Sequence, residues 1–204
     1  MILRYYGVPK DAEYGDKFMG RFPILFQERT KDMTQTCMCW GIECPKGWYH
    51  ILEQLCTVLE FYNMEFVKNY NVAIVADQVK EKYGTLRFYF TIRTVDDNGV
   101  IIPLYDETNP PDNMTNVLDA NKHRLAADYL EMLADNIIRE ADQMTEDTCA
   151  VCGVPLDKYN KVETKGWISY ICKHCHEHPD GEDEDEELDG PEEKGDEEAP
   201  VGEV

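Results

Sequence analysis

Two cysteine pairs near the end of the chain have the types and the spacing of a metal site. Cys149 and Cys152 form one C-x2-C unit, and Cys172 and Cys175 form a second one after nineteen intervening residues. Four thiolates complete the tetrahedral shell that Zn²⁺ prefers, and a closed shell leaves no position for a reacting water. Gly153 favours the tight turn that the first pair needs. The spacing therefore predicts one structural zinc ion per chain, held by these four cysteines.

Two alternatives stay open around these ligands. A histidine beside the second pair could replace Cys175, and the candidates are His174, His176 and His178. A second metal could bind three N-terminal cysteines together with His50 or Cys56; the three are Cys37, Cys39 and Cys44. Their C-x-C-x4-C spacing matches no common zinc unit, and Cys56 has the position of a small core residue. We therefore expect one metal.

A set of basic and aromatic residues could bind a ligand on a sheet face. Alternation along two neighbouring extended segments places them on the outward side; they are Lys80, Lys82, Arg87, Tyr89 and Arg93. Basic side chains contact phosphates, and an aromatic ring can stack on a nucleobase. The alternative is an ordinary solvated sheet face, on which acids such as Glu81 pair with the lysines.

The helices and strands expected around these residues indicate an α+β fold. Apolar spacing of three and four predicts a helix over residues 47–62, with one buried face; that face comprises Trp48, Ile51, Leu52, Leu55, Leu59 and Tyr62. Strands are expected at residues 72–75, 86–92 and 100–102, with turns at residues 83–84 and 97–99. Together they predict an antiparallel β-meander packed with two helices.

The second helix is expected over residues 117–144. Its buried face is predicted to contain Leu125, Tyr129, Met132, Leu133, Ile137, Ala141 and Met144. After this helix, the cysteine pairs with an apolar strand between them predict a C-terminal zinc knuckle of treble-clef or ribbon-like form. The expected organisation is an α+β domain over residues 1–145, a zinc-binding module over 146–178 and a disordered acidic tail over 179–204.

The charge of the chain limits its partners. The 204 residues carry a net charge of −21. Residues 180–204 contain 14 acids and one lysine, a net of −13, which leaves −8 for residues 1–179. A general duplex-DNA binder needs a surplus of bases, so that class is disfavoured. No apolar run is long enough to span a membrane, and the first residues do not form a secretory signal. We expect a cytoplasmic protein without a membrane partner.

Catalytic motifs are not apparent. The chain contains no phosphate-binding Gly-rich loop, no nucleophile elbow and no His-Glu-x-x-His motif. His50 and His123 are isolated in the sequence, and His50 is expected to pack or cap at the start of its helix. We therefore expect a protein that is not an enzyme.

Three blocks together resemble a known group of proteins. They are Gly41-Ile-Glu-Cys-Pro-Lys-Gly-Trp-Tyr-His-Ile-Leu, Gln78-Val-Lys-Glu-Lys-Tyr-Gly-Thr-Leu-Arg-Phe-Tyr, and Cys149-Ala-Val-Cys-Gly with Gly166-Trp-Ile-Ser-Tyr-Ile-Cys. They are similar to an uncharacterised family of small bacteriophage and prophage proteins with a Gly-Trp helix, a QVKEKFGGLRFY-type hairpin and a C-terminal zinc knuckle. This chain departs at Tyr83 and Thr85, where the family has Phe and Gly, and at Cys175, where relatives often carry His. The resemblance spans residues 21–175 and implies a viral origin, without an established activity.

Two function classes follow from these features. The first is a phage-encoded interaction protein that binds and modulates a host protein, in which the acidic tail steers towards a basic partner or mimics phosphate. The second is a small nucleic-acid or nucleotide-binding protein that uses the face from Lys80 to Arg93 together with the zinc module.

Overall fold

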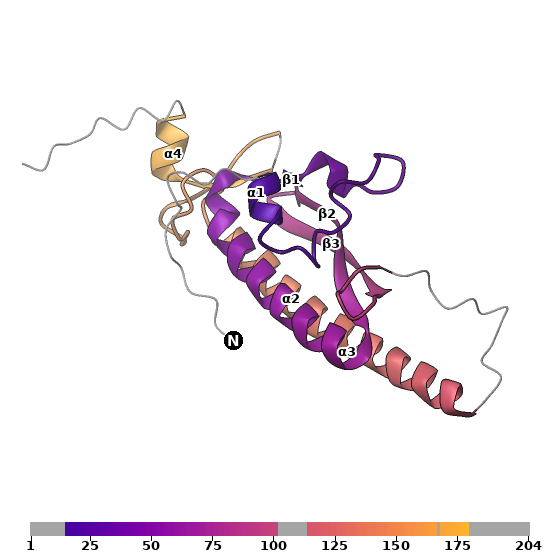
Figure 1. Cartoon of the computed structure of the whole chain (residues 1–204). Coiled ribbons are helices and arrows are strands. Elements are labelled where there is room, and N and C mark those ends of the chain that lie inside the picture. Colours follow the sequence, from indigo (N-terminus) through magenta and orange to yellow (C-terminus); the bar gives the residue numbers. More distant parts are fainter. Residues whose placement is uncertain (1–14, 102–113, 167, 180–204) are drawn as a thin grey trace, which may run out of the picture.

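The structure, a computed structural model, describes residues 15–101, 114–166 and 168–179. Its elements, in chain order, are α1 (Asp16–Met19), the 3-10 helix η1 (Met38–Trp40), β1 (Ile42–Glu43), the 3-10 helix η2 (Lys46–Trp48), α2 (Tyr49–Tyr70), β2 (Val72–Lys82), β3 (Thr85–Thr94), α3 (Met114–Glu146), β4 (Lys161–Glu163), β5 (Tyr170–Cys172) and α4 (Lys173–Glu177). The helices α2 and α3 run side by side and pack against the β2–β3 hairpin (Figure 1). The predicted α+β class is confirmed.

The sheet is mixed rather than an antiparallel meander. Its strand order is β1-β2-β3, with β2 and β3 antiparallel and β1 parallel to β2. Of the third strand expected at residues 100–102, the structure describes residues 100 and 101, and Ile101 there forms an isolated bridge with Val95. The side chain of Gln27 accepts a hydrogen bond from the backbone N–H of Ile101 and donates one to the carbonyl of Gly99. These groups are therefore not available to extend the ladder along β3.

The helix α2 confirms the predicted buried face and extends beyond the predicted end. Trp48, Ile51, Leu52, Leu55 and Leu59 are completely buried, whereas Tyr62 is half-buried. The helix continues for two turns beyond Tyr62, because nothing before Asn71 interrupts it. There Asn71 adopts a left-handed conformation, with φ of 54°, and its N–H donates to the carbonyl of Val67.

The helix α3 buries a different face from the predicted one. Among residues 121–146, the buried apolar residues of this helix are Ala126, Leu130, Ala134, Ile137 and Ala141. Ile137 and Ala141 were expected there, but Leu125, Tyr129 and Met132 are exposed. The small alanines allow the helix backbone to approach its neighbours closely, which turns the larger side chains outward. The buried face is thus shifted by one position along the first half of the described helix.

A buried carboxylate joins the N-terminal segment to the body. Glu60 on α2 accepts hydrogen bonds from the backbone N–H groups of Ile24 and Leu25, both at 2.9 Å. The carbonyl of Leu25 accepts from the N–H of Ala76 on β2, at 2.8 Å. Phe22, Leu25 and Phe26 of this segment are buried. The segment covers the edge of β2 that β1 leaves open.

The C-terminal module has no separate core. Cys149, Ala150, Leu156, Ile171 and Cys172 belong to the same buried cluster as the residues of α2 and the sheet. The predicted boundary at residue 145 coincides with the end of α3 at Glu146. Except for Pro179, the predicted acidic tail lies outside the described residues. Among those residues, no helix combines the length and the apolar character that crossing a membrane requires.

Candidate metal centre

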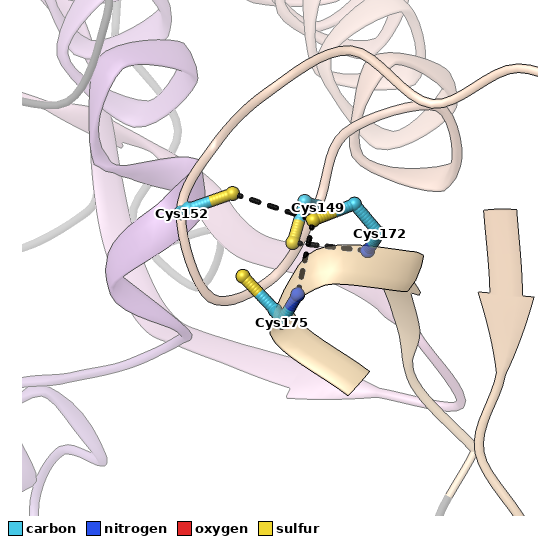
Figure 2. Close-up of side chains that lie close together, drawn as sticks. All are labelled: Cys149, Cys152, Cys172 and Cys175. Atoms are coloured by element: carbon cyan, nitrogen blue, oxygen red, sulfur yellow. Dashed lines mark hydrogen bonds between the residues drawn. The ribbon is translucent and has the colours of Figure 1, made fainter. Parts of the chain in front are cut away.

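The four predicted ligands come together at one end of the helix pair. Their Sγ atoms all lie within 4.8 Å of one another, and the Sγ atoms of Cys152 and Cys172 are 3.7 Å apart. Figure 2 shows the four side chains pointing toward one another from two segments. A tetrahedral zinc ion with bonds of about 2.3 Å places its sulfur ligands roughly 3.8 Å apart. The cluster therefore fits a zinc ion, and it leaves no ligand position open.

The first pair is held by a tight backbone turn. The N–H of Gly153 donates to the carbonyl of Cys149 at 2.9 Å, and the N–H of Cys149 donates to the carbonyl of Val154 at 2.9 Å. Gly153 has a φ of 77°, which a residue with a side chain rarely adopts. The turn therefore needs glycine at this position, as the sequence indicates.

The second pair is placed by a hairpin and a short helix. β4 and β5 pair antiparallel, with Val162 opposite Ile171. Cys172 ends β5 and caps α4, and its sulfur accepts a hydrogen bond from the N–H of Cys175. The N–H of Cys172 in turn donates to the sulfur of Cys149 at 3.3 Å. A turn, a hairpin and a helix that carries the last ligand follow one another as in a treble clef.

The thiols have unequal affinities for protons. Burial raises the pKa of Cys152 to about 11 and raises the pKa of Cys175 further. Burial also acts to raise the pKa of Cys149, but backbone N–H groups, foremost that of Cys152, donate to its sulfur and lower this pKa below its ordinary value. A metal ion must therefore displace protons from Cys152 and Cys175, whereas the lowered pKa of Cys149 makes its proton easier to displace.

The segment before α2 attaches the metal centre to the body. The N–H of Gly47 donates to the carbonyl of Ala150 at 3.0 Å, and the indole Nε1 of Trp48 donates to the carbonyl of Thr148 at 3.2 Å. A Cβ atom on Gly47 would lie 2.1 Å from the carbonyl oxygen of Cys149. From the sequence, Gly47 and Trp48 were expected only at the start of a helix, and their contact with the metal centre was not predicted. The adjacent Gly-Trp pair is the sequence feature from which this contact could have been predicted.

The other candidate ligands do not join a cluster. Within the part of the chain that the structure describes, no further group of three metal-ligating side chains lies together. Cys37 is exposed, and Cys56 is completely buried, as expected for a core residue. Burial raises the pKa of Cys44 to about 12. The second-metal alternative and the replacement of Cys175 by a histidine therefore find no support in the arrangement of the described side chains.

The predicted ligand-binding face divides into two parts. Lys80 lies opposite Arg87 in the hairpin, and its Nζ lies 5.4 Å from the centre of the Tyr89 ring. Lys82 is exposed at the tip, where its Nζ lies 5.3 Å from the ring of Tyr83. Lys80, Lys82 and Tyr89 thus form one small surface with Tyr83.

Arg87 lies beside Lys80 but contacts α3, and Arg93 lies at the other end of the hairpin. Arg87 forms an ion pair with Asp142 of α3 at 2.8 Å, so its charge is partly neutralised. Arg93 pairs with Ala73 at the other end of the hairpin, where its Nε is buried. The face from Lys80 to Arg93 is therefore not one continuous basic surface.

No protein-family model, no curated protein and no solved structure matches the chain. The resemblance to a family of phage proteins stays a prediction.

Proposed function

We propose that this chain is a zinc-stabilised interaction protein, encoded by a bacteriophage, that binds and modulates a host protein in the host cytoplasm. Two features support a binding role over catalysis. The metal cluster is closed by four sulfurs and has no place for a substrate. It also lies at one end of the fold, where it holds the C-terminal module against the body.

One observation carries the proposal, namely the exposure of large apolar side chains on both long helices. These are Phe61 at 55%, Met64 at 55%, Leu125 at 65%, Tyr129 at 54% and Met132 at 49% exposure. Scattered exposed apolar residues are ordinary, but several of them on two adjacent helices are typical of a protein-binding surface. The acidic tail supplies long-range attraction to a basic partner.

Native mass spectrometry tests this proposal directly. The chain is purified without chelator from a bacterial host, and we expect a complex of one chain, one zinc ion and one host protein. The recovered protein is then assayed alone and with added chain, to show whether its activity changes. Removal of residues 179–204 should slow association. A chain that carries zinc but no host protein in any candidate host would contradict the proposal.

A second candidate function is binding of a nucleic acid or nucleotide. The observation that favours it is the pairing of Lys80 with Tyr89 and of Lys82 with Tyr83, which offers cations and exposed rings together. We expect the Lys80→Glu, Lys82→Glu double variant to abolish binding of a fluorescent oligonucleotide. The matched control is Lys158→Glu with Lys173→Glu, which changes the net charge equally on the zinc module. Binding that is insensitive to salt would argue against this function.

A further inference from the structure

Two histidines at the C-terminal end of the described chain lie together on the surface. The ring centres of His174 and His178 are 4.8 Å apart, and the ring planes are inclined by 42° rather than stacked face to face. Both residues are exposed, and α4 lies at one end of the molecule (Figure 1). From the sequence they were candidates to replace Cys175, but Cys175 itself completes the four-cysteine cluster. The histidine pair therefore lies beside the metal centre without belonging to it.

Helical spacing sets the separation of the two rings. The N–H of His178 donates to the carbonyl of His174 at 2.9 Å, so the two residues lie one helical turn apart on the same side of α4. A helix of five residues does not persist alone in water. Here Cys172 caps α4, and the helix packs against β4 and β5. The pair is therefore preorganised, and a ligand does not have to order it.

The separation of the rings fits one metal ion bound by both of them. Two imidazole nitrogens at about 2.0–2.1 Å from one ion, with an angle of roughly 90–110° between them, place the ring centres about 4.5–5.2 Å apart. The observed 4.8 Å lies within this range. Imidazole suits Zn²⁺, Ni²⁺ and Cu²⁺, whereas Mg²⁺ and Ca²⁺ prefer oxygen ligands. The pair therefore selects a divalent transition-metal ion.

The charge of the chain favours a cation at this position. The helix α4 itself carries one base, Lys173, and one acid, Glu177. Residues 180–204, which begin two residues after His178, add a net charge of −13. A negative field raises the local concentration of cations without distinguishing one metal from another. The field thus supplies attraction, and the two imidazoles supply selectivity.

We propose that His174 and His178 form a second metal site, which binds one divalent transition-metal ion reversibly. Two protein ligands leave the other coordination positions of this ion to water, so it exchanges, in contrast to an ion in the closed four-cysteine shell. The bound ion links the first turn of α4 to the residue that ends it, and so stabilises the helix that carries Cys175. This site goes beyond the host-protein interaction and does not depend on it.

Nickel binding to the zinc-loaded full chain tests the proposal. Ni²⁺ is the probe because native mass spectrometry distinguishes it from the zinc already bound. We expect one nickel ion to add to the chain with its single zinc ion, and calorimetry to show that an excess of Mg²⁺ does not displace the nickel. Nickel that only replaces zinc, or nickel that Mg²⁺ displaces, would overturn the proposal.

Histidine substitutions test the location. His174→Ala and His178→Ala should each weaken nickel binding at least tenfold, since each removes a direct ligand. The matched control is His176→Ala, at an exposed histidine of α4 outside the pair, which should change the affinity less than twofold. All three variants should keep their zinc; His178→Ala decides the test if His174→Ala, next to Cys175, loses it. Equal weakening by His176→Ala and His178→Ala would show that the pair is not the site.

The acidic segment provides the remaining test. In a full-length variant, the 14 acids of residues 180–204 are replaced by the corresponding amides. Nickel should still bind one per chain, with an affinity at low salt reduced only to that of the parent chain at high salt. Loss of nickel in this variant, with retention in His178→Ala, would assign the ion to the carboxylates and overturn the proposal. None of these measurements requires a host protein, so failure of the site and failure of the interaction function are distinguishable.

Discussion

The metal centre and the α2–α3 groove differ in how their residues are brought together. The metal centre takes two ligands from one turn and two from the start of α4, so each pair is close in sequence. The groove between the two long helices is lined by Phe66 and Tyr70 from α2 and by Ala126 and Tyr129 from α3, about sixty residues later. Ligand spacing specifies the first arrangement locally, whereas the packing of two long helices decides the second.

The two regions also differ in what stabilises them. Four thiolates on one metal bind strongly enough to hold a small module in one geometry. The groove is lined by side chains of two packed helices, and no metal bond holds it in one geometry. Loss of the metal should therefore change the fold of its region, whereas substitution of an exposed side chain at the groove, such as Leu125, should leave the fold intact.

The largest effect is expected from removal of a metal ligand. Cys149→Ser should abolish zinc binding and lower the free energy of unfolding by at least about 5 kcal/mol, since zinc-finger peptides gain about 10–16 kcal/mol from their metal. Zinc is counted by mass spectrometry, and amide exchange should show lost protection across β4 and β5. The control is Cys37→Ser, because Cys37 is exposed and lies outside the cluster. Full zinc content in Cys149→Ser would contradict the assignment.

Detachment of the module from the body should have the next largest effect. In Gly47→Ala, the new methyl group meets the carbonyl oxygen of Cys149 at 2.1 Å, so the backbone must move. We expect a loss of about 3 kcal/mol in the free energy of unfolding, at the upper end of overpacking costs, with zinc retained. Denaturant unfolding measures this loss. Gly15→Ala is the control, because no atom lies within 4 Å of the added Cβ there.

Two substitutions test which face of α3 is buried, one at a buried position and one at an exposed position. Ala134→Leu adds volume at a completely buried position and should lower the free energy of unfolding by about 1–3 kcal/mol. Leu125→Ser removes a larger apolar group but should change stability by less than about 0.5 kcal/mol, because Leu125 is 65% exposed. Thermal unfolding of both variants provides the measurement. A larger loss of stability for Leu125→Ser than for Ala134→Leu would show that the buried face is the one expected from the sequence.

The sequence predicts those features that depend on neighbouring residues. The spacing of Cys149, Cys152, Cys172 and Cys175 and the glycine after the first pair sufficed to predict the cluster. Alternation of Leu86, Phe88 and Phe90 predicted β3, and the Tyr83–Gly84 turn predicted its pairing with β2. In each case the chemistry of a short segment restricts its conformation, so no distant contact is needed to choose it.

The missed features depend on distant contacts. The spacing of apolar residues in α3 is compatible with burial of either of two adjacent faces, and the large apolar residues favoured the face that is exposed. Close packing against the neighbouring elements selects the face with Ala126, Ala134 and Ala141. The segment at residues 100–102 was expected as a strand, but Gln27, more than seventy residues earlier, accepts from the N–H of Ile101. Neither choice is encoded within the segment concerned.

Substitution of Glu60 has the smallest expected effect. This residue lies within a helix that the sequence predicts, but its hydrogen bonds are to the distant residues Ile24 and Leu25. Burial raises the pKa of this carboxyl, and the N–H groups of Ile24 and Leu25 oppose the shift. A carboxyl with a raised pKa in the folded state contributes stability below its ordinary pKa near 4.5, and this contribution is lost as the pH rises through the raised value.

Glu60→Gln should therefore lower the free energy of unfolding by about 1 kcal/mol at pH 4.5, because the new amide cannot accept from both backbone N–H groups. This difference in the free energy of unfolding from the parent chain should narrow as the pH rises. Urea unfolding between pH 4.5 and 7 measures this difference. The control is Glu65→Gln, at an exposed position on the same helix, whose difference from the parent chain should stay near zero at every pH. If the difference in the free energy of unfolding between Glu60→Gln and the parent chain stays constant or widens as the pH rises, burial does not raise the pKa of the Glu60 carboxyl. Glu60 would then behave as an acid on the surface does.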